Sequence, residues 1–93
     1  MNSQINKVIK VNVLSASQLE SYITANLACD YIKVVGDDGT HFEAVIVSPE
    51  FVGKNMIQQH QLVYAALGGR MRAEIHALSM RTITPEKWAE MNQ

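Results

Sequence analysis

The 93-residue chain is poor in the features that define several common protein classes. Its one cysteine, Cys29, cannot form an internal disulfide, so a disulfide-stapled scaffold is excluded. The sequence has no apolar run of about 18 residues, as a membrane-spanning helix would need. Its first residues lack the charged start, apolar middle and small-residue cleavage site of a signal peptide. We therefore expect a cytoplasmic protein without a membrane span.

The balance of charge is close to neutral. The sequence has eight Lys and Arg residues against nine Asp and Glu residues, which gives a formal net charge of −1 at pH 7. Nucleic-acid-binding proteins usually carry a basic excess, because contacts to phosphate supply most of their affinity. A local basic patch around Lys54, or around Arg70, Arg72 and Arg81, remains open. Cations spread over several segments are more typical of a solvated face.

The rest of the composition is that of one small globular domain. Apolar residues make up 47% and charged residues 18% of the chain, which is ordinary for a protein with a modest core. The spacing of apolar residues then indicates where helices and strands lie. The predicted elements are a helix at about 17–28, strands at 31–36 and 41–48, a helix at about 55–67, a strand at 73–82 and a helix that begins at Pro85.

Local signals mark the bounds of these elements. Ser17 and Glu20 have the spacing of a capping box at a helix start. The Asp-Gly pair inside "DDGT" (37–40) predicts the turn of a β-hairpin. The pair Gly68–Gly69 is expected to end the second helix, and Thr84 to cap the last one with Pro85 at its first position.

The order of elements, α-β-β-α-β-α, predicts an α+β domain in which helices cover a small three-stranded sheet. Residues 1–16, whose pattern fits a strand and a helix equally well, are predicted to be an N-terminal extension, and 17–93 to be the domain. In the second strand, one face is expected to carry Phe42, Ala44 and Ile46 and the other Glu43, Val45 and Val47. In the second helix, the expected apolar face comprises Met56, Ile57, His60, Val63, Tyr64 and Leu67. Trp88 is expected to pack the last helix onto the sheet.

No known constellation of catalytic residues is present in the sequence. It has no Gly-x-x-x-x-Gly-Lys, Gly-x-Gly-x-x-Gly, Cys-x-x-Cys or His-Glu-x-x-His motif. Cys29 is expected to be a partly buried, unreactive thiol near the end of a helix. The "GDDG" stretch at 36–39 resembles a Gly-x-x-Gly nucleic-acid clamp, but its two aspartates would repel phosphate. The chain is therefore predicted not to be an enzyme.

The three histidines are the candidates for chemistry. His60 falls on the apolar face of a helix and is expected to be structural. His41 begins the second strand and His76 lies in the third, so both side chains could converge on one side of the sheet. Neutral imidazole is a good ligand for iron, zinc or copper. Two histidines do not complete a metal site, so the other ligands would have to come from a partner or a small thiol.

A set of motifs resembles the BolA family, most of all its short bacterial IbaG-like branch. The motifs run in order along the chain. They are "GTHF", "VIVSPEFVGK", "QQHQLVYAAL", "IHALSMRT" and "TPEKW", within a match that covers residues 17–90. The resemblance implies a class II KH-like fold, in agreement with the order of elements predicted above.

The resemblance also implies a role as an adaptor. BolA-like proteins pair with monothiol glutaredoxins and share a 2Fe–2S cluster with them, to which the glutaredoxin brings its cysteine and glutathione. The histidine of the "IHAL" strand, here His76, would be one ligand from this chain. The second would come from the loop between the first two strands, where His41 is the nearest imidazole and the family's usual position falls near Asp38. Whether the isolated chain is a monomer or a homodimer stays open.

Some BolA relatives are described as transcriptional regulators, so a nucleic-acid-binding regulator is the alternative function. In those relatives the second helix often carries Arg-His-Arg. Here the corresponding residues are Gln59, His60 and Gln61. Losing two cations removes contacts to phosphate. The sequence therefore favours the adaptor, with weak nucleic-acid binding at most.

Overall fold

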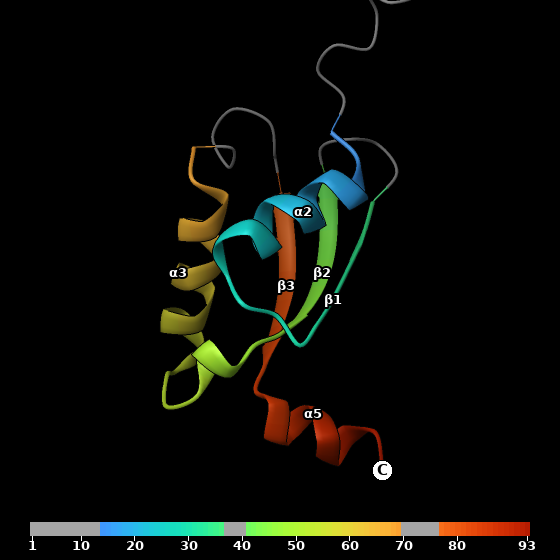
Figure 1. Ribbon diagram of the computed structural model, residues 1–93. Helices are drawn as coiled ribbons and strands as arrows, with labels where there is room; N and C mark the ends of the chain where they lie inside the picture. Colours follow the sequence, from blue (N-terminus) through green and yellow to red (C-terminus); the bar gives the residue numbers. More distant parts are fainter. Residues whose placement is uncertain (1–13, 37–40, 70–76) are drawn as a thin grey trace, which may run out of the picture.

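The computed structural model describes residues 14–36, 41–69 and 77–93 (Figure 1). Within them the order of elements agrees with the α+β fold predicted from the sequence. The elements are α2 (Ala16–Asn26), β1 (Tyr31–Val35), β2 (His41–Val47), the short 3-10 helix η2 (Pro49–Phe51), α3 (Met56–Leu67), β3 (Ala77–Ile83) and α5 (Pro85–Met91). None of the helices in these ranges is long and apolar enough to cross a membrane.

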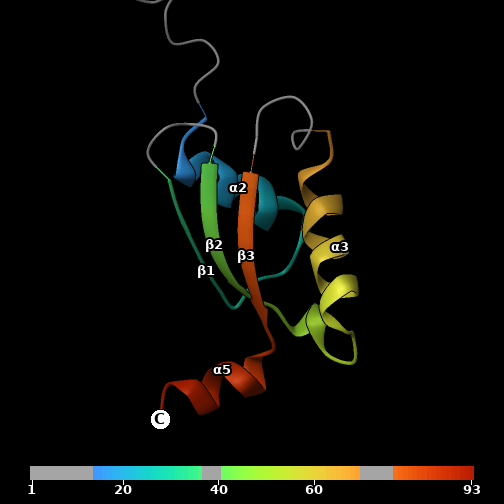
Figure 2. The same cartoon turned by 180° about the vertical axis from the view of Figure 1, so that it is seen from behind.

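The three strands form one mixed sheet in the order β1-β2-β3. The β1–β2 pair is antiparallel, as expected of a hairpin, although the turn at 37–40 lies outside the described residues. The β2–β3 pair is parallel. A parallel pair needs a long crossover between its strands, and η2 and α3 belong to that connection. Helices α2 and α3 lie on one side of the sheet, and α5 lies across one of its ends (Figures 1 and 2).

The core lies between the sheet and the two helices. The predicted alternation along β2 is confirmed, because Phe42, Ala44 and Ile46 are buried whereas His41 and Glu43 are exposed. Helix α2 buries Leu19 and Ile23 against this face. The core cluster consists of Leu14, Leu19, Ile23, Leu27, Val34, Phe42, Ala44, Ile46, Phe51, Val63, Ala66 and Leu67.

Helix α2 begins one residue earlier than predicted. Ser15, and not Ser17, is the N-cap, and its capping box is completed by Gln18. Glu20 is taken up elsewhere, since its Oε2 accepts a hydrogen bond of 2.8 Å from the backbone N–H of Val34 in β1. The predicted separate extension at 1–16 stays a prediction, because residues 1–13 lie outside the described ranges.

Helix α3 is bounded as predicted, but its apolar face is not. Asn55 caps its start, and Gly68, with a φ of 63°, ends it. The buried residues are Val63, Ala66 and Leu67, all in the second half. Met56 and Ile57 were expected on the buried face, yet they are 68% and 70% exposed. The apolar spacing of α3 continues into its first turn, but the side chains of that turn lie outside the core. Phe51 of η2, which precedes α3, is the fully buried residue in this part of the chain.

Tyr64, also assigned to the buried face of α3, is 41% exposed. The structure thus corrects three of the six residues predicted for that face, and leaves His60 half-buried. The buried stripe of α3 is therefore narrower than its apolar spacing suggests.

Helix α5 rests on the sheet through one aromatic contact. Thr84 caps it as predicted, with Pro85 in its first turn. The rings of Trp88 and Tyr31 are stacked, with centroids 4.8 Å apart and planes at 22°. Trp88 is only half-buried, and α5 has no buried residue. Trp88 therefore packs the last helix onto the sheet at β1, as predicted, while its side chain stays partly exposed.

The substitution Trp88→Ala should lower the free energy of unfolding by about 1–2 kcal/mol. A fully buried tryptophan would cost about 3–5 kcal/mol, whereas an aromatic pair at a half-exposed site contributes less. Urea unfolding followed by circular dichroism measures the change, and Trp88→Phe should recover most of it. A loss above about 3 kcal/mol would show that α5 is part of the core.

Candidate functional site

The end of the sheet where β2 and β3 begin gathers residues from all three strands. In the parallel β2–β3 pair, His41 is level with Ala77 and Phe42 with Leu78. The antiparallel β1–β2 pair brings Val35, the last residue of β1, level with Glu43. Residues separated by more than 30 positions in the sequence therefore meet at one edge of the molecule.

A shallow hollow of about 320 Å³ lies at this edge. Its lining contains one imidazole and one carboxylate on the same strand. The lining residues are Val35, Gly36, His41, Phe42, Glu43, Ala77 and Ser79. Because Phe42 is buried on the helix side, the alternation of β2 places His41 and Glu43 on the opposite, exposed face. His41 is thus held at the start of a strand, on the surface of the domain.

Gly36 is required by the close approach of the backbone at this edge. A Cβ atom at position 36 would lie 2.6 Å from the carbonyl oxygen of His41 and 2.6 Å from Cδ1 of Phe42. Real Cβ contacts do not reach that distance, so either the ring or the strand would have to move. The glycine was recognised in the sequence only as the end of a strand, because the contact depends on how β1 meets β2.

The first predicted ligand, His76, lies outside the described residues, as does Asp38. His76 immediately precedes Ala77, the residue paired with His41. No group of three or more His, Cys, Asp or Glu residues that could hold a metal occurs in the described ranges. At this edge the described residues contain one imidazole, that of His41, a group of the kind that can bind iron.

His60 does not join His41. It is half-buried on α3 and lines a different hollow of about 470 Å³, between α3, β3 and α5. Met56, Met80 and Met91 line the same hollow, together with Arg81 and Lys87. The expectation that His60 is structural fits this half-buried place among methionine side chains.

The side chain of Gln59, the neighbour of His60, connects α3 by hydrogen bonds to the segment that precedes it and to β3. Its Nε2 donates hydrogen bonds to the carbonyl oxygens of Phe51 (3.2 Å) and Lys54 (2.8 Å). The hydroxyl of Thr82 in β3 donates to its Oε1 at 2.6 Å. In the sequence, Gln59 stands out only because it lacks a positive charge. Nothing in the local sequence marks this role, because all three partners are distant or lie in the preceding turn.

Cys29 follows α2 and is half-buried, as predicted. Burial raises the pKa of its thiol above the ordinary value, and the nearby carboxylates of Glu50 and Asp30 raise that pKa further. The Sγ atom lies 3.4 Å from the carbonyl oxygen of Leu27 and donates to it. A thiol with a raised pKa is a poor nucleophile and a poor metal ligand near neutral pH.

Comparison with known proteins gives one family. Residues 3–87 match the family model described as BolA-like protein. The chain is 35% identical to Protein BOLA2 of Arabidopsis thaliana over 85 residues, which cover 87% of this chain and 90% of that protein. It is 39% identical over 54 residues to a protein of Haemophilus influenzae named DNA-binding transcriptional regulator BolA, covering 58% of this chain and 52% of that protein.

For some relatives, the match covers only part of the relative's own length. For human BolA-like protein 1, with 41% identity over 54 residues, it covers 58% of this chain but only 39% of the relative. Solved structures agree in fold. A bol-like protein from Babesia bovis superposes with a TM-score of 0.77 and 32% identity, over 86% of this chain and 95% of that one. For yeast Fra2 the TM-score is 0.66 and the identity 27%, over 87% and 89%.

The substitution Gly36→Ala should destabilise the domain by about 1–3 kcal/mol, because a Cβ atom forces the Phe42 ring or the start of β2 to move. Gly69→Ala is the matched control, since a Cβ atom at Gly69 meets nothing within 4 Å. Urea unfolding measures both variants. Equal stabilities for the two would contradict the close packing at the His41 edge.

Cys29 should react slowly with a thiol reagent at pH 8 in the folded protein and rapidly once urea unfolds it. The pKa of the Cys29 thiol is higher in the folded than in the unfolded protein, where it is about 8.5. The free energy of unfolding should therefore fall as the pH rises above that unfolded-state pKa. Urea unfolding between about pH 8 and 10 should show this decline, and Cys29→Ser should reduce it. Equal labelling rates in both states would contradict the assignment.

Proposed function

We propose, because this chain belongs to the BolA family, that it is a non-enzymatic adaptor for a monothiol glutaredoxin. The two proteins would share a 2Fe–2S cluster, in iron–sulfur cluster trafficking or in the response to iron and stress. The family resemblance supplies the partner and the cluster. The contact proposed for this chain is the edge of the sheet that carries His41.

The observation that carries the proposal is the register of the parallel pair. His41 and Ala77 are level, and His76 is joined to Ala77 by a single peptide bond. His41 therefore begins β2 beside Ala77, the first residue of β3, and Ala77 directly follows His76 in the sequence. An antiparallel pairing of the same strands would have put the start of β2 beside the end of β3.

The chemistry of the proposed site divides the ligands between two molecules. A 2Fe–2S cluster is held by four ligands, and histidine replaces cysteine in some of these clusters. His76 and His41 would supply nitrogen from this chain. The glutaredoxin cysteine and glutathione would supply sulfur. Cys29 takes no part, since its thiol is half-buried after α2 with a raised pKa.

His41 is preferred to Asp38 as the second ligand from this chain. It is exposed at the start of β2 and lines the hollow at that edge. An aspartate oxygen matches a cluster iron less well than an imidazole nitrogen does.

The second candidate function is a nucleic-acid-binding regulator, which the name of the Haemophilus influenzae relative favours. The net charge of −1 counts against it. So does Gln59, whose side chain is engaged in hydrogen bonds to Phe51, Lys54 and Thr82 at a position where many relatives carry a cation. Retention on DNA that falls steeply with salt would support this function.

The adaptor proposal predicts a change in the visible circular dichroism of a monothiol glutaredoxin reconstituted with iron, sulfide and glutathione, when this protein is added. His76→Ala should abolish the change. His41→Ala should weaken it or shift its bands, because one nitrogen ligand is lost. His60→Ala is the matched control and should behave as the wild type does, since His60 lies in a separate hollow.

An unaltered glutaredoxin spectrum with the wild-type protein would overturn the proposal. If His41→Ala keeps the wild-type spectrum while His76→Ala loses it, the second ligand is Asp38 or another group. Each variant's far-ultraviolet circular dichroism separates lost ligation from lost fold.

A further inference from the structure

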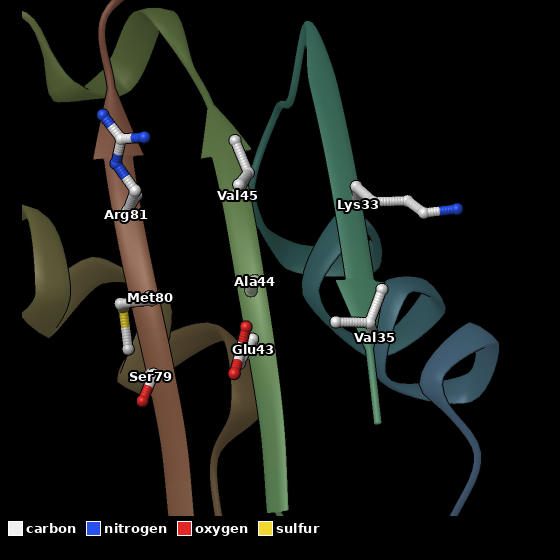
Figure 3. A pocket seen from close by; sticks show the side chains of 8 residues that line it. All are labelled: Lys33, Val35, Glu43, Ala44, Val45, Ser79, Met80 and Arg81. Carbon is white, nitrogen blue, oxygen red and sulfur yellow. The ribbon is translucent and has the colours of Figure 1, made fainter. Parts of the chain in front are cut away.

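The face of the sheet opposite α2 and α3 is left open over its middle by the described part of the chain (Figure 2). Side chains from all three strands line a trough of about 270 Å³ on it (Figure 3). Six of its lining residues alternate onto this face and are exposed or half-buried: Lys33, Val35, Glu43, Val45, Ser79 and Arg81. The buried Ala44 and the half-buried Met80 complete the lining. Val35, Glu43 and Ser79 also line the hollow at the His41 edge. The core does not explain why this face combines two valines with two cations and one carboxylate.

The register arranges these side chains in two rows across the sheet. In one row Val45 lies between Lys33 on β1 and Arg81 on β3. In the next row Glu43 lies between Val35 and Ser79. The close-up in Figure 3 shows both rows, with Val45 level with the two cations and Glu43 level with the smaller side chains. Within a single copy, none of the three charged groups forms an ion pair among the described residues.

We propose that this face is a self-association surface, on which a second copy of this chain packs sheet to sheet about a two-fold axis. An axis that runs across the strands, between the two rows, brings each row opposite the other row of the second copy. Glu43 of one copy then lies over Val45 of the other, between its Lys33 and its Arg81. The symmetry makes the same contact twice.

The charge pattern selects a second copy as the occupant. Neighbouring strands are about 4.8 Å apart, so one carboxylate can reach both cations that flank Val45. Packed sheets lie about 10 Å apart, a gap that Glu, Lys and Arg side chains span from opposite sides. Val35 and Val45 provide the apolar contact between the charges. Helix α5 is held one row further along the sheet, where Trp88 stacks on Tyr31.

Variants that reverse the charges on this face test the proposal. Sedimentation velocity measures the oligomeric state of each variant at protein concentrations from about 10 µM to 1 mM. The wild type should sediment increasingly as a dimer. Glu43→Arg should weaken the dimer by about tenfold or more, because three cations then meet in each contact. The double variant Lys33→Glu with Arg81→Glu should weaken the dimer to a similar extent, because three carboxylates then meet in each contact.

A mixture of these two variants is the decisive measurement. In the mixed pair, Arg at position 43 of one copy lies between two glutamates, and Glu43 of the other lies between Lys33 and Arg81. The mixture should therefore form a dimer that neither variant forms alone. Lys54→Glu, an exposed cation away from this face, is the control and should dimerise as the wild type does.

A wild type that is monomeric at every concentration would overturn the proposal. So would a wild-type dimer that Glu43→Arg leaves intact, which would place self-association on another surface. Failure of the mixed variants to pair would also contradict the two-row contact. These outcomes are independent of glutaredoxin binding, since no cluster or partner is present in the experiment.

Discussion

The parallel pairing of β2 with β3 is the constraint on which the rest of the structure depends. Two parallel strands cannot be joined by a tight turn, so the chain must leave the end of β2 and return to its start. Helix α3 runs within that connection, and its second half covers the core. The same pairing fixes His41 level with Ala77. The helical layer and the candidate site are therefore two consequences of one strand arrangement.

Hydrogen bonds made by side chains join the sheet to both α2 and α3. At the edge strand β1, the N–H of Val34 donates to Glu20 of α2, so this backbone group is not offered to another strand. At the other edge, Thr82 of β3 donates to Gln59, which also holds the turn that precedes α3.

The sequence predicted the parts of the fold that depend on local pattern. The alternation of Phe42, Ala44 and Ile46, the glycine stop at Gly68 and the Thr84 cap are confirmed. Capping-box patterns begin at both Ser15 and Ser17 in the sequence. In the structure Ser15 and Gln18 form the box, and Glu20 instead accepts a hydrogen bond from Val34. Helical spacing could not show that Met56 and Ile57 lie beyond the core. For the candidate site, spacing suggested that two histidines could converge, whereas the cluster and its partner came from family resemblance alone.

The most direct measurement of the central claim is pulsed electron paramagnetic resonance of the reduced cluster in the complex with glutaredoxin. Only this chain would carry ¹⁵N-labelled histidine, so a nitrogen coupling from the label identifies ligation by its imidazoles. The account predicts strong ¹⁵N couplings that lose one component in the His41→Ala protein. A cluster that forms in the complex without any ¹⁵N coupling would contradict ligation by this chain.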